Sequence, residues 1–541
     1  MARLTLILGV LATVIYLLDG FRFMLNEWRR WRNKGTWLAV LGLCLVPSMG
    51  EAASHYIRVG AVGANDGSTW ADAWTDFPSG TTYIRGDEYY VASGTYPLGG
   101  QFSTDPSGAT LIKICKSTIS TIGSCSTAHG SETGWLDAYG TGQAIIGTGA
   151  YTPNQSGFHV PAFKHYWVFD GVVGSGSDPS VYGFHMTPSG GLIDEAIVTF
   201  HGNNVTVKHI AITCPGAGFD VEQLGFNGIG ENATVSYGYA DNCQVSMNNR
   251  GADNTIENSW FATHWSSAAH HGVHVEQVLR PIFRNNVMTY CAGPCIEAGN
   301  ADLTNGAYYN NVFANINSGN GIIKGTSSDS VIDTVVYGNT VINCAGPILY
   351  QNNLGLGAGS GNTVVNNLLY NSSPELINEG GAGAIAHSYN SHFDHTAGSP
   401  PAETGLQDTT GNPIVNYANE DYHLRYATDG GQVLGAPYTT DLYGIARGGD
   451  GTWDRGAAEF SNASSQAVIA RIVRFMDIAV IVAGMGWHFR KQVMAVSLAA
   501  IAGCGTLYQL APRSYETLKV VSKDSTMKVL TVFNHLTKPR G

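Results

Sequence analysis

Residues 305–345 read NGAYYNNVFANINSGNGIIKGTSSDSVIDTVVYGNTVINCA and contain two copies of a phrase that recurs through the middle of the chain. In each copy, a short β-branched or aromatic run leads into an asparagine, and a second such run follows it. Gly, Asn and Ser punctuate the runs, and the apolar residues lack helical spacing. The stretch therefore predicts short strands joined by tight turns.

The phrase returns six times between residues 254 and 393. Its aligned asparagines are Asn258, Asn286, Asn311, Asn339, Asn367 and Asn390. They are 28, 25, 28, 28 and 23 residues apart, and such a period indicates a solenoid of stacked repeats. A coil of about 25 residues with three short strands predicts a parallel β-helix, an all-β fold whose coils pair at about 4.8 Å.

The repeated asparagine has a structural role in such a coil. Asparagines stacked at a bend can bond amide to amide along the axis, and Asn tolerates the left-handed backbone of tight bends. We therefore expect these six asparagines to form an internal ladder. Weaker coils are expected before it, at residues 167–170 and 205–208.

Composition excludes one class of partner. The chain has 541 residues, a net charge of -12, and only 13% charged residues, against about 25% in ordinary soluble domains. The basic residues lie mostly near the two ends, so no basic stripe is available for a phosphate backbone. We expect no nucleic-acid partner. Asparagine is concentrated in the centre, where 28 of 37 fall between residues 201 and 400.

The first 53 residues are typical of an exported protein. An apolar run at 4–18 is followed by a basic loop, a second apolar run at 37–46, and small residues at 50–53 that suit a signal-peptide cleavage site. The alternative is a membrane hairpin with a cytoplasmic basic loop. In either case the positive-inside rule places the chain from residue 54 onward outside the cytoplasm, in an extracellular, periplasmic or cell-surface location.

Residues 461–541 form a separate C-terminal tail. The tail holds two mostly apolar stretches, 467–487 and 493–510, separated by a short basic segment. This pattern predicts a helical hairpin associated with the membrane, and the alternative is a hydrophobic helical cap on the preceding domain. The expected organisation is a signal or anchor region at 1–53, a β-helix domain at 54–460 and this membrane-associated tail.

Nine cysteines are present, and two of them, Cys44 and Cys504, lie in the terminal apolar segments. Cys115 and Cys125 flank a short polar loop, while Cys214 and Cys243 are one option for a second pair. Spacing alone leaves the connectivity open.

A second column of side chains carries the candidate chemistry. After each ladder turn, apolar and polar residues alternate, which predicts Glu276, Glu297, Lys324, Tyr350 and Asn378 on one outer face. Neighbours there would lie about 5 Å apart. Acids beside a lysine and a phenol suit proton abstraction from a uronic acid or hydrolysis of a glycosidic bond. The alternative is a solvated face whose opposite charges compensate one another.

Histidines and tryptophans cluster just before this column. His264, His270, His271 and His274 fall within eleven residues. We name His271 and His274 as candidate catalytic bases, and Trp260, Trp265 and Gln351 as candidate substrate-binding residues, because aromatic rings stack on sugars. The alternative is a loop of exposed histidines. The sequence does not decide whether a metal ion binds here. Calcium, if bound, would prefer oxygens from Glu276, Glu297 and Asn300.

The chain resembles secreted bacterial right-handed parallel β-helix proteins of the pectate-lyase-like superfamily. The opening phrases lie at residues 56–59, 65–74 and 86–96, and the closing phrases at 421–424, 441–447 and 453–460. The resemblance covers roughly residues 55–460. It implies a right-handed parallel β-helix and, more weakly, a polysaccharide partner.

A narrower resemblance is to polysaccharide lyases of the alginate-lyase and chondroitinase-B type, on Asn285, Asn286, Cys291 and Gly293. The lyase lysine and arginine are unmatched, because Gln277 and Ala298 occupy their positions. Whether the chain is an enzyme is therefore left open. The leading hypothesis is an exported, membrane-associated β-helix that binds an extracellular polysaccharide and cleaves it if catalytic. The alternative is a non-catalytic scaffold among membrane-complex subunits.

Overall fold

The computed structural model describes residues 52–461 apart from internal gaps. The gaps fall at 79–81, 98, 127, 131, 148–156, 188–196, 215–223, 229, 249–251, 263–272, 277–278, 292, 300–302, 317–320, 326–330, 352–360, 380–384 and 397. The chain divides into two compact units, residues 1–460 and 461–541. The export signal and membrane tail predicted above lie outside the described residues. Within the described ranges, no helix has the length and apolar character needed to span a membrane.

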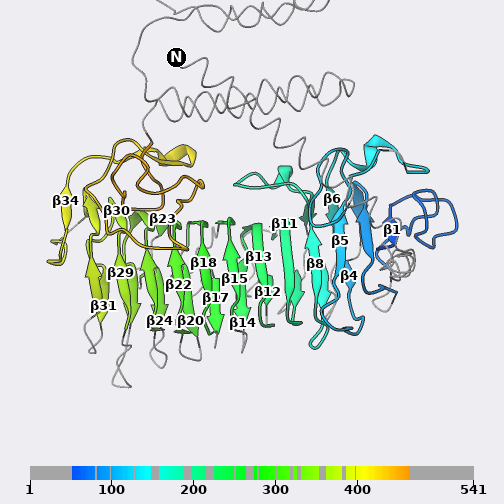
Figure 1. The fold of residues 1–541 in the computed structure, drawn as a ribbon, viewed down its shortest axis with the longest axis horizontal. Helices are drawn as coiled ribbons and strands as arrows, with labels where there is room; N and C mark the ends of the chain where they lie inside the picture. The colour runs from blue at the N-terminus through cyan, green and yellow to red at the C-terminus, as the bar shows by residue number, and fades with distance from the viewer. Residues whose placement is uncertain are drawn as a thin grey trace, which may run out of the picture. The chain divides into compact units, whose positions relative to one another are not determined.

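The described residues form an all-β solenoid in which strands of successive coils pair in parallel (Figure 1). Three columns of strands run along its axis. Column 1 contains β1 (Ser54–Ile57), β2 (Glu88–Val91), β5 (Ile112–Lys116), β8 (Trp167–Asp170), the first halves of β11 (Val205–Thr213) and β13 (Thr234–Asp241), β15 (Thr255–Glu257), β18 (Ile282–Arg284), β22 (Ala307–Tyr309), β26 (Val335–Tyr337), β29 (Thr363–Val365) and β32 (Ala386–Ser388).

Column 2 belongs to the same 22-stranded sheet. It contains β3 (Gly94–Tyr96), β6 (Ala144–Ile146), β9 (Phe184–Met186), the second halves of β11 and β13, β16 (Trp260–Ala262), β19 (Val287–Thr289), β23 (Val312–Ile316), β27 (Thr340–Cys344), β30 (Leu368–Tyr370), β33 (Ser391–Phe393) and β34 (Gln407–Thr409). The predicted early coils are present as β8 and β11.

Column 3 is a separate ten-stranded sheet. It contains β4 (Gly100–Gln101), β7 (Phe158–Val160), β10 (Val198–Phe200), β12 (Leu224–Gly228), β14 (Gln244–Asn248), β17 (Val273–Glu276), β20 (Ile296–Gly299), β24 (Ile323–Gly325), β28 (Leu349–Gln351) and β31 (Ile377–Glu379).

The remaining elements are short. They are the parallel pair β21 (Leu303–Thr304) and β25 (Val331–Ile332), the antiparallel pair β35 (Ile414–Asn416) and β36 (Asp421–Leu424), and the 3-10 helices η1 (Asp137–Tyr139), η2 (Pro179–Val181) and η3 (Tyr417–Asn419). The expected all-β parallel solenoid is therefore confirmed, while its right-handed sense stays a prediction.

The side-chain alternation of each strand fills the interior. In column 2, Met288, Phe313, Val341 and Leu369 follow one another at paired positions and are at most 2% exposed. Because every coil contributes apolar side chains from all three columns, one hydrophobic core extends along the axis.

An amide ladder runs inside the corner between columns 1 and 2. Asn286, Asn311, Asn339 and Asn367 each donate from Nδ2 to Oδ1 of the next asparagine at 3.0 Å, and the last acceptor is Asn390. These five side chains are fully buried. The residue before each adopts a left-handed backbone, with φ between 54° and 56°. The turn therefore points the asparagine side chain inward.

Asn258 does not belong to this internal ladder, which corrects the sequence prediction. The inner position of its coil is Ser259, whose backbone amide donates to Oδ1 of Asn286 at 3.0 Å. Asn258 has φ 52° and occupies the left-handed outer position, where its Oδ1 accepts from Asn285 at 3.2 Å. An outer amide stack, Asn258–Asn285–Asn310, thus accompanies the inner one.

Residues 411–460, here called the cover segment, pack on the outside of column 2. Ile414, Tyr422 and Leu424 of this segment join a second hydrophobic cluster with outward side chains of the column such as Trp260. The segment also reaches the outer corner, where Arg447 donates to Oδ1 of Asn310 at 2.8 Å. From β16 to β33, the outer face of column 2 is therefore buried beneath the cover segment.

The described residues contain two disulfides, Cys115–Cys125 and Cys214–Cys243, so both pairings considered from the sequence form. Cys291, Cys295 and Cys344 are free and buried.

Candidate functional site

The strand register of column 3 aligns polar residues in one continuous line. Strand register brings together, in order, Gln101, His159, Thr199, Asn227, Ser246, His274, Glu297, Lys324, Tyr350 and Asn378. Strand neighbours lie about 4.8 Å apart, so the line extends for roughly 40 Å. A polar line of this length matches the shape of an extended polymer.

An ion pair lies within this line. Nζ of Lys324 is 3.1 Å from Oε1 of Glu297. The Glu297 side chain is only 7% exposed and the Lys324 side chain 20% exposed. Burying a carboxylate is costly unless a cation compensates its charge, and the contact with Lys324 offsets the burial of the Glu297 side chain. The structure thus joins two of the predicted catalytic side chains.

The register changes the composition of the predicted column. Glu297 pairs with His274, whereas Glu276 pairs with Gly299, two residues further along. Tyr350 occupies the predicted position beside Lys324, and Gln351 pairs with Gly325. Glu276 is therefore not the direct neighbour of Glu297. For His274, Glu276, Tyr350 and Gln351 the structure describes the backbone and not the side chain.

Two further predicted residues, His271 and Trp265, lie outside the described residues, as does Asn300 of the proposed calcium set. Within the described part of the chain, no group of three or more His, Cys, Asp or Glu side chains could hold a metal ion.

Trp260 is not a substrate-binding residue, which corrects a second prediction. Its side chain is 8% exposed in the hydrophobic cluster beneath the cover segment. Its ring lies 6.3 Å from that of Tyr422. Trp260 points outward from column 2, as a sugar-binding ring would, but the chain itself covers it.

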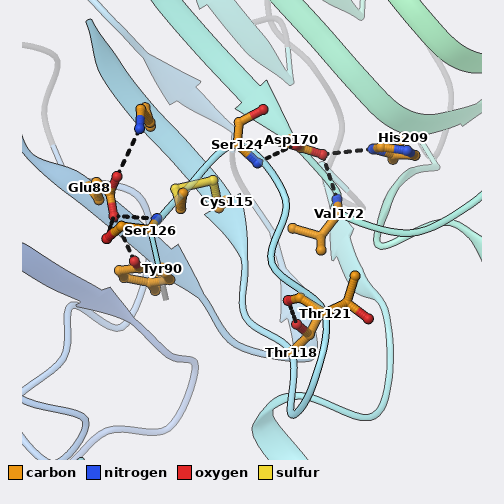
Figure 2. Close-up of a disulfide and its surroundings, with 12 residues drawn as sticks. Glu88, Tyr90, Cys115, Thr118, Thr121, Ser124, Ser126, Asp170, Val172 and His209 are labelled. Carbon is orange, nitrogen blue, oxygen red and sulfur yellow. Dashed lines mark hydrogen bonds and ion pairs between the residues drawn. A yellow bond between two sulfur atoms is a disulfide. The ribbon is translucent and has the colours of Figure 1, made fainter. Parts of the chain in front are cut away.

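A second polar cluster, which the sequence reasoning missed, lies near the Cys115–Cys125 disulfide (Figure 2). Asp170, at the end of β8, is 1% exposed and accepts from the backbone amides of Ser124 and Val172 and from the ring of His209. Burial alone would raise the pKa of Asp170, but the hydrogen bonds from these partners outweigh burial and bring it to about 2. Because 39 residues separate Asp170 from His209, no local motif signals this contact.

Glu88 forms the neighbouring part of this cluster. Its carboxylate accepts from Oγ of Ser126 at 2.6 Å and from the hydroxyl of Tyr90 at 2.7 Å, and it pairs with Lys113 at 2.9 Å. Burial favours the neutral acid, yet these hydrogen bonds lower the pKa of Glu88 overall. Glu88 is surrounded by its own partners, which gives it a structural role.

No family model and no curated protein matches this chain. Among solved structures, the chain is similar to XylC in complex with xylose, with 9% identity and a TM-score of 0.42 over 76% of this chain and 99% of that one. It is similar to a GH136 lacto-N-biosidase from Eubacterium ramulus, with 11% identity and a TM-score of 0.43 over 66% of each chain. It is also similar to a PL6 family polysaccharide lyase from Pseudopedobacter saltans, with 12% identity and a TM-score of 0.33 over 65% of this chain and 94% of that one. Likenesses this distant leave the assignment of function to the residues of this chain.

Proposed function

We propose that this protein binds an extended polysaccharide along column 3 and hydrolyses it beside Glu297 and Lys324. The observation that carries the proposal is the 3.1 Å ion pair between these residues, set within an uninterrupted polar line. Sugar hydroxyls can exchange hydrogen bonds with such a line at every coil. The largely buried carboxylate is the group with the environment of a catalytic acid or base.

Hydrolysis requires a second carboxyl group. Glu276 lies one strand away from Glu297 and two residues further along, which places their Cα atoms about 8 Å apart. Inverting glycosidases hold their two carboxyl groups, as distinct from their Cα atoms, roughly 6.5–9.5 Å apart to admit a water molecule, and this Cα separation allows two glutamate side chains to reach that range. In this proposal Glu297 activates the water, Glu276 protonates the leaving oxygen, and Lys324 holds Glu297 in place.

The proposed setting is extracytoplasmic, with residues 1–53 directing export and residues 461–541 attaching the protein to a membrane. Apolar runs of the sequence support both parts of this setting. A protein truncated after Phe460 should then remain folded and lose membrane binding in a vesicle-flotation assay. Membrane binding that survives the truncation would refute attachment by the tail.

The test of function uses purified protein and a panel of neutral and uronate polysaccharides, with binding measured by calorimetry and products by mass spectrometry. Glu297→Gln and Lys324→Ala should each lower turnover by 100-fold or more, the usual scale for an acid–base residue. Glu257→Gln is the matched control, because Glu257 is an ion-paired carboxylate on column 1. It should leave turnover unchanged.

Products distinguish the mechanisms. New reducing ends with water added indicate hydrolysis, whereas an unsaturated uronate would show elimination and overturn the assigned chemistry. Turnover that survives both column 3 variants would place the site elsewhere. Absence of both binding and turnover would favour the scaffold alternative.

A further inference from the structure

At one corner of the solenoid, the imidazole of His209 is held by a hydrogen bond to a buried carboxylate. The proposed polysaccharide site does not use this histidine. Asp170 accepts from Nδ1 of His209 at 2.7 Å. Because Asp170 is ionised, it accepts the proton that Nδ1 carries, and Nε2 is the ring nitrogen left for chemistry. The His209 side chain is 19% exposed while that of Asp170 is 2% exposed. A basic nitrogen is thus fixed near the surface by a buried carboxylate.

Several layers of structure position this carboxylate. Cys115 is the direct strand partner of Asp170, and its disulfide closes the loop that brings Ser124 to the carboxylate. A Cβ on Gly123 would lie 2.8 Å from Oδ2 of Asp170, so the loop approaches through glycine. Asp170 is therefore held from the side opposite His209, as Figure 2 shows.

Two neighbours of His209 are Lys208, the preceding residue of β11, and Tyr237, whose ring stacks on the imidazole. Lys208 lies in register between Asp170 and Ser236, and buried Val207 beside it places Lys208 on the outer face. The ring of His209 stacks on that of Tyr237 at 4.9 Å and 11°. Tyr237 is 37% exposed and has φ 51°, a left-handed conformation that is uncommon for a bulky residue.

We propose that Asp170, His209 and Lys208 form a second hydrolytic site, for acyl esters of sugar hydroxyls. His209 takes a proton from water through Nε2, and the water oxygen bonds to the acyl carbon. Lys208 stabilises the resulting oxyanion. The ester C–O bond then breaks, the sugar alkoxide takes the proton back from Nε2, and a carboxylic acid is released. Asp170 is a positioning residue that fixes the tautomer.

The chemistry favours esters over glycosides. Glycoside hydrolysis needs a proton donor and a second carboxyl group beside the bond. Asp170 is the carboxylate that contacts His209 among the described residues, and it is ionised and buried beneath the loop that carries Ser124. One imidazole acting first as base and then as acid is sufficient for an ester. The exposed edge of Tyr237 provides apolar area for the sugar ring.

The experiment measures acetate release from O-acetylated xylan and hydrolysis of p-nitrophenyl acetate by the full chain. His209→Gln should lower kcat by 100-fold or more, and Lys208→Met by about 10-fold with little change in KM. His423→Gln is the matched control, since His423 also pairs with an aspartate and stacks on a tyrosine, but its Asp421 is 42% exposed. It should have no effect.

Asp170→Asn tests positioning. It should lower kcat with little change in KM, and circular dichroism checks its fold. If this variant unfolds, His209→Gln, which alters a partly exposed side chain, still decides the matter. Wild-type hydrolysis no faster than that of His209→Gln would overturn the inference. Glu297→Gln should keep the esterase activity, so failure of the polysaccharide site and failure of this site are distinguishable.

Discussion

Asn390 donates from Nδ2 to Oε2 of Glu403 at 2.9 Å, and its backbone amide donates to Oε1 at 2.6 Å. Glu403 therefore terminates the ladder with a carboxylate whose side chain is fully buried. For the four preceding ladder residues, the Oδ1 of the next asparagine receives this pair of donors, and here the two oxygens of one carboxylate replace it. His387 contacts Oε2 at 2.8 Å.

Glu403→Leu should destabilise the end of the solenoid. It leaves the backbone N–H of Asn390 and one of its two Nδ2 hydrogens buried without an acceptor, at roughly 1–3 kcal/mol each, while the other Nδ2 hydrogen keeps the carbonyl of Val364. Glu403→Gln keeps one acceptor oxygen and should lose less. Urea unfolding followed by circular dichroism measures both, and equal losses for the two variants would argue against a terminating role.

Asn311→Leu should lower the free energy of unfolding by at least about 3 kcal/mol. Its Oδ1 accepts both from the backbone amide and from Nδ2 of Asn286, so two buried donors lose their acceptor. Asn258→Gly is the control, because Asn258 lies in the partly exposed outer stack and glycine keeps its left-handed backbone without strain, and it should cost less than half as much. A larger loss at Asn258 would contradict the assignment of inner and outer positions.

Trp260→Ala should affect stability and not glycan binding. Removing a buried Trp side chain typically costs about 3–5 kcal/mol. The thermal midpoint should fall, while calorimetric affinity for any bound glycan, measured well below that midpoint, stays at the wild-type value. Lost affinity in a folded variant would restore Trp260 as a contact residue.

Repetition made the solenoid predictable, because one coil repeated at a fixed period leaves little choice of fold. The prediction for Asn258 was wrong by one residue. In the other coils the inner ladder position is an asparagine, but in this coil it is Ser259, so aligning the asparagines selected Asn258, the residue before the inner position. The ladder is read correctly only once the left-handed residue before each inner position is known.

The site was less predictable because it depends on register and on distant packing. Coil lengths vary, so sequence alternation alone could not show that Glu297 pairs with His274 instead of Glu276. Trp260 is covered by Tyr422, 162 residues later in the sequence. Asp170 and His209 are 39 residues apart, and their adjacency follows only from the pairing of β8 with β11.

His392 makes stability depend on pH. It lies in β33 with a fully buried ring, and burial lowers its pKa to about 4, with Asp408 opposing and His395 adding to the shift. Its unfolded pKa is about 6.5. As the pH falls below 6.5, His392 becomes protonated in the unfolded chain, whereas in the folded protein it stays neutral until about pH 4. The free energy of unfolding therefore decreases as the pH falls through this window.

The expected loss from His392 at pH 5 is about 2 kcal/mol relative to pH 7.5, from a shift of roughly 2.5 pKa units. His392→Leu removes the titrating group and should reduce the pH dependence by that amount. Urea unfolding of both proteins at pH 7.5 and pH 5 gives the comparison. His201, whose pKa burial also lowers to about 4, remains in both proteins and cancels in the difference. If the two proteins lose equal stability between these pH values, then His392 accepts a proton in the folded state and its burial does not control the acid sensitivity.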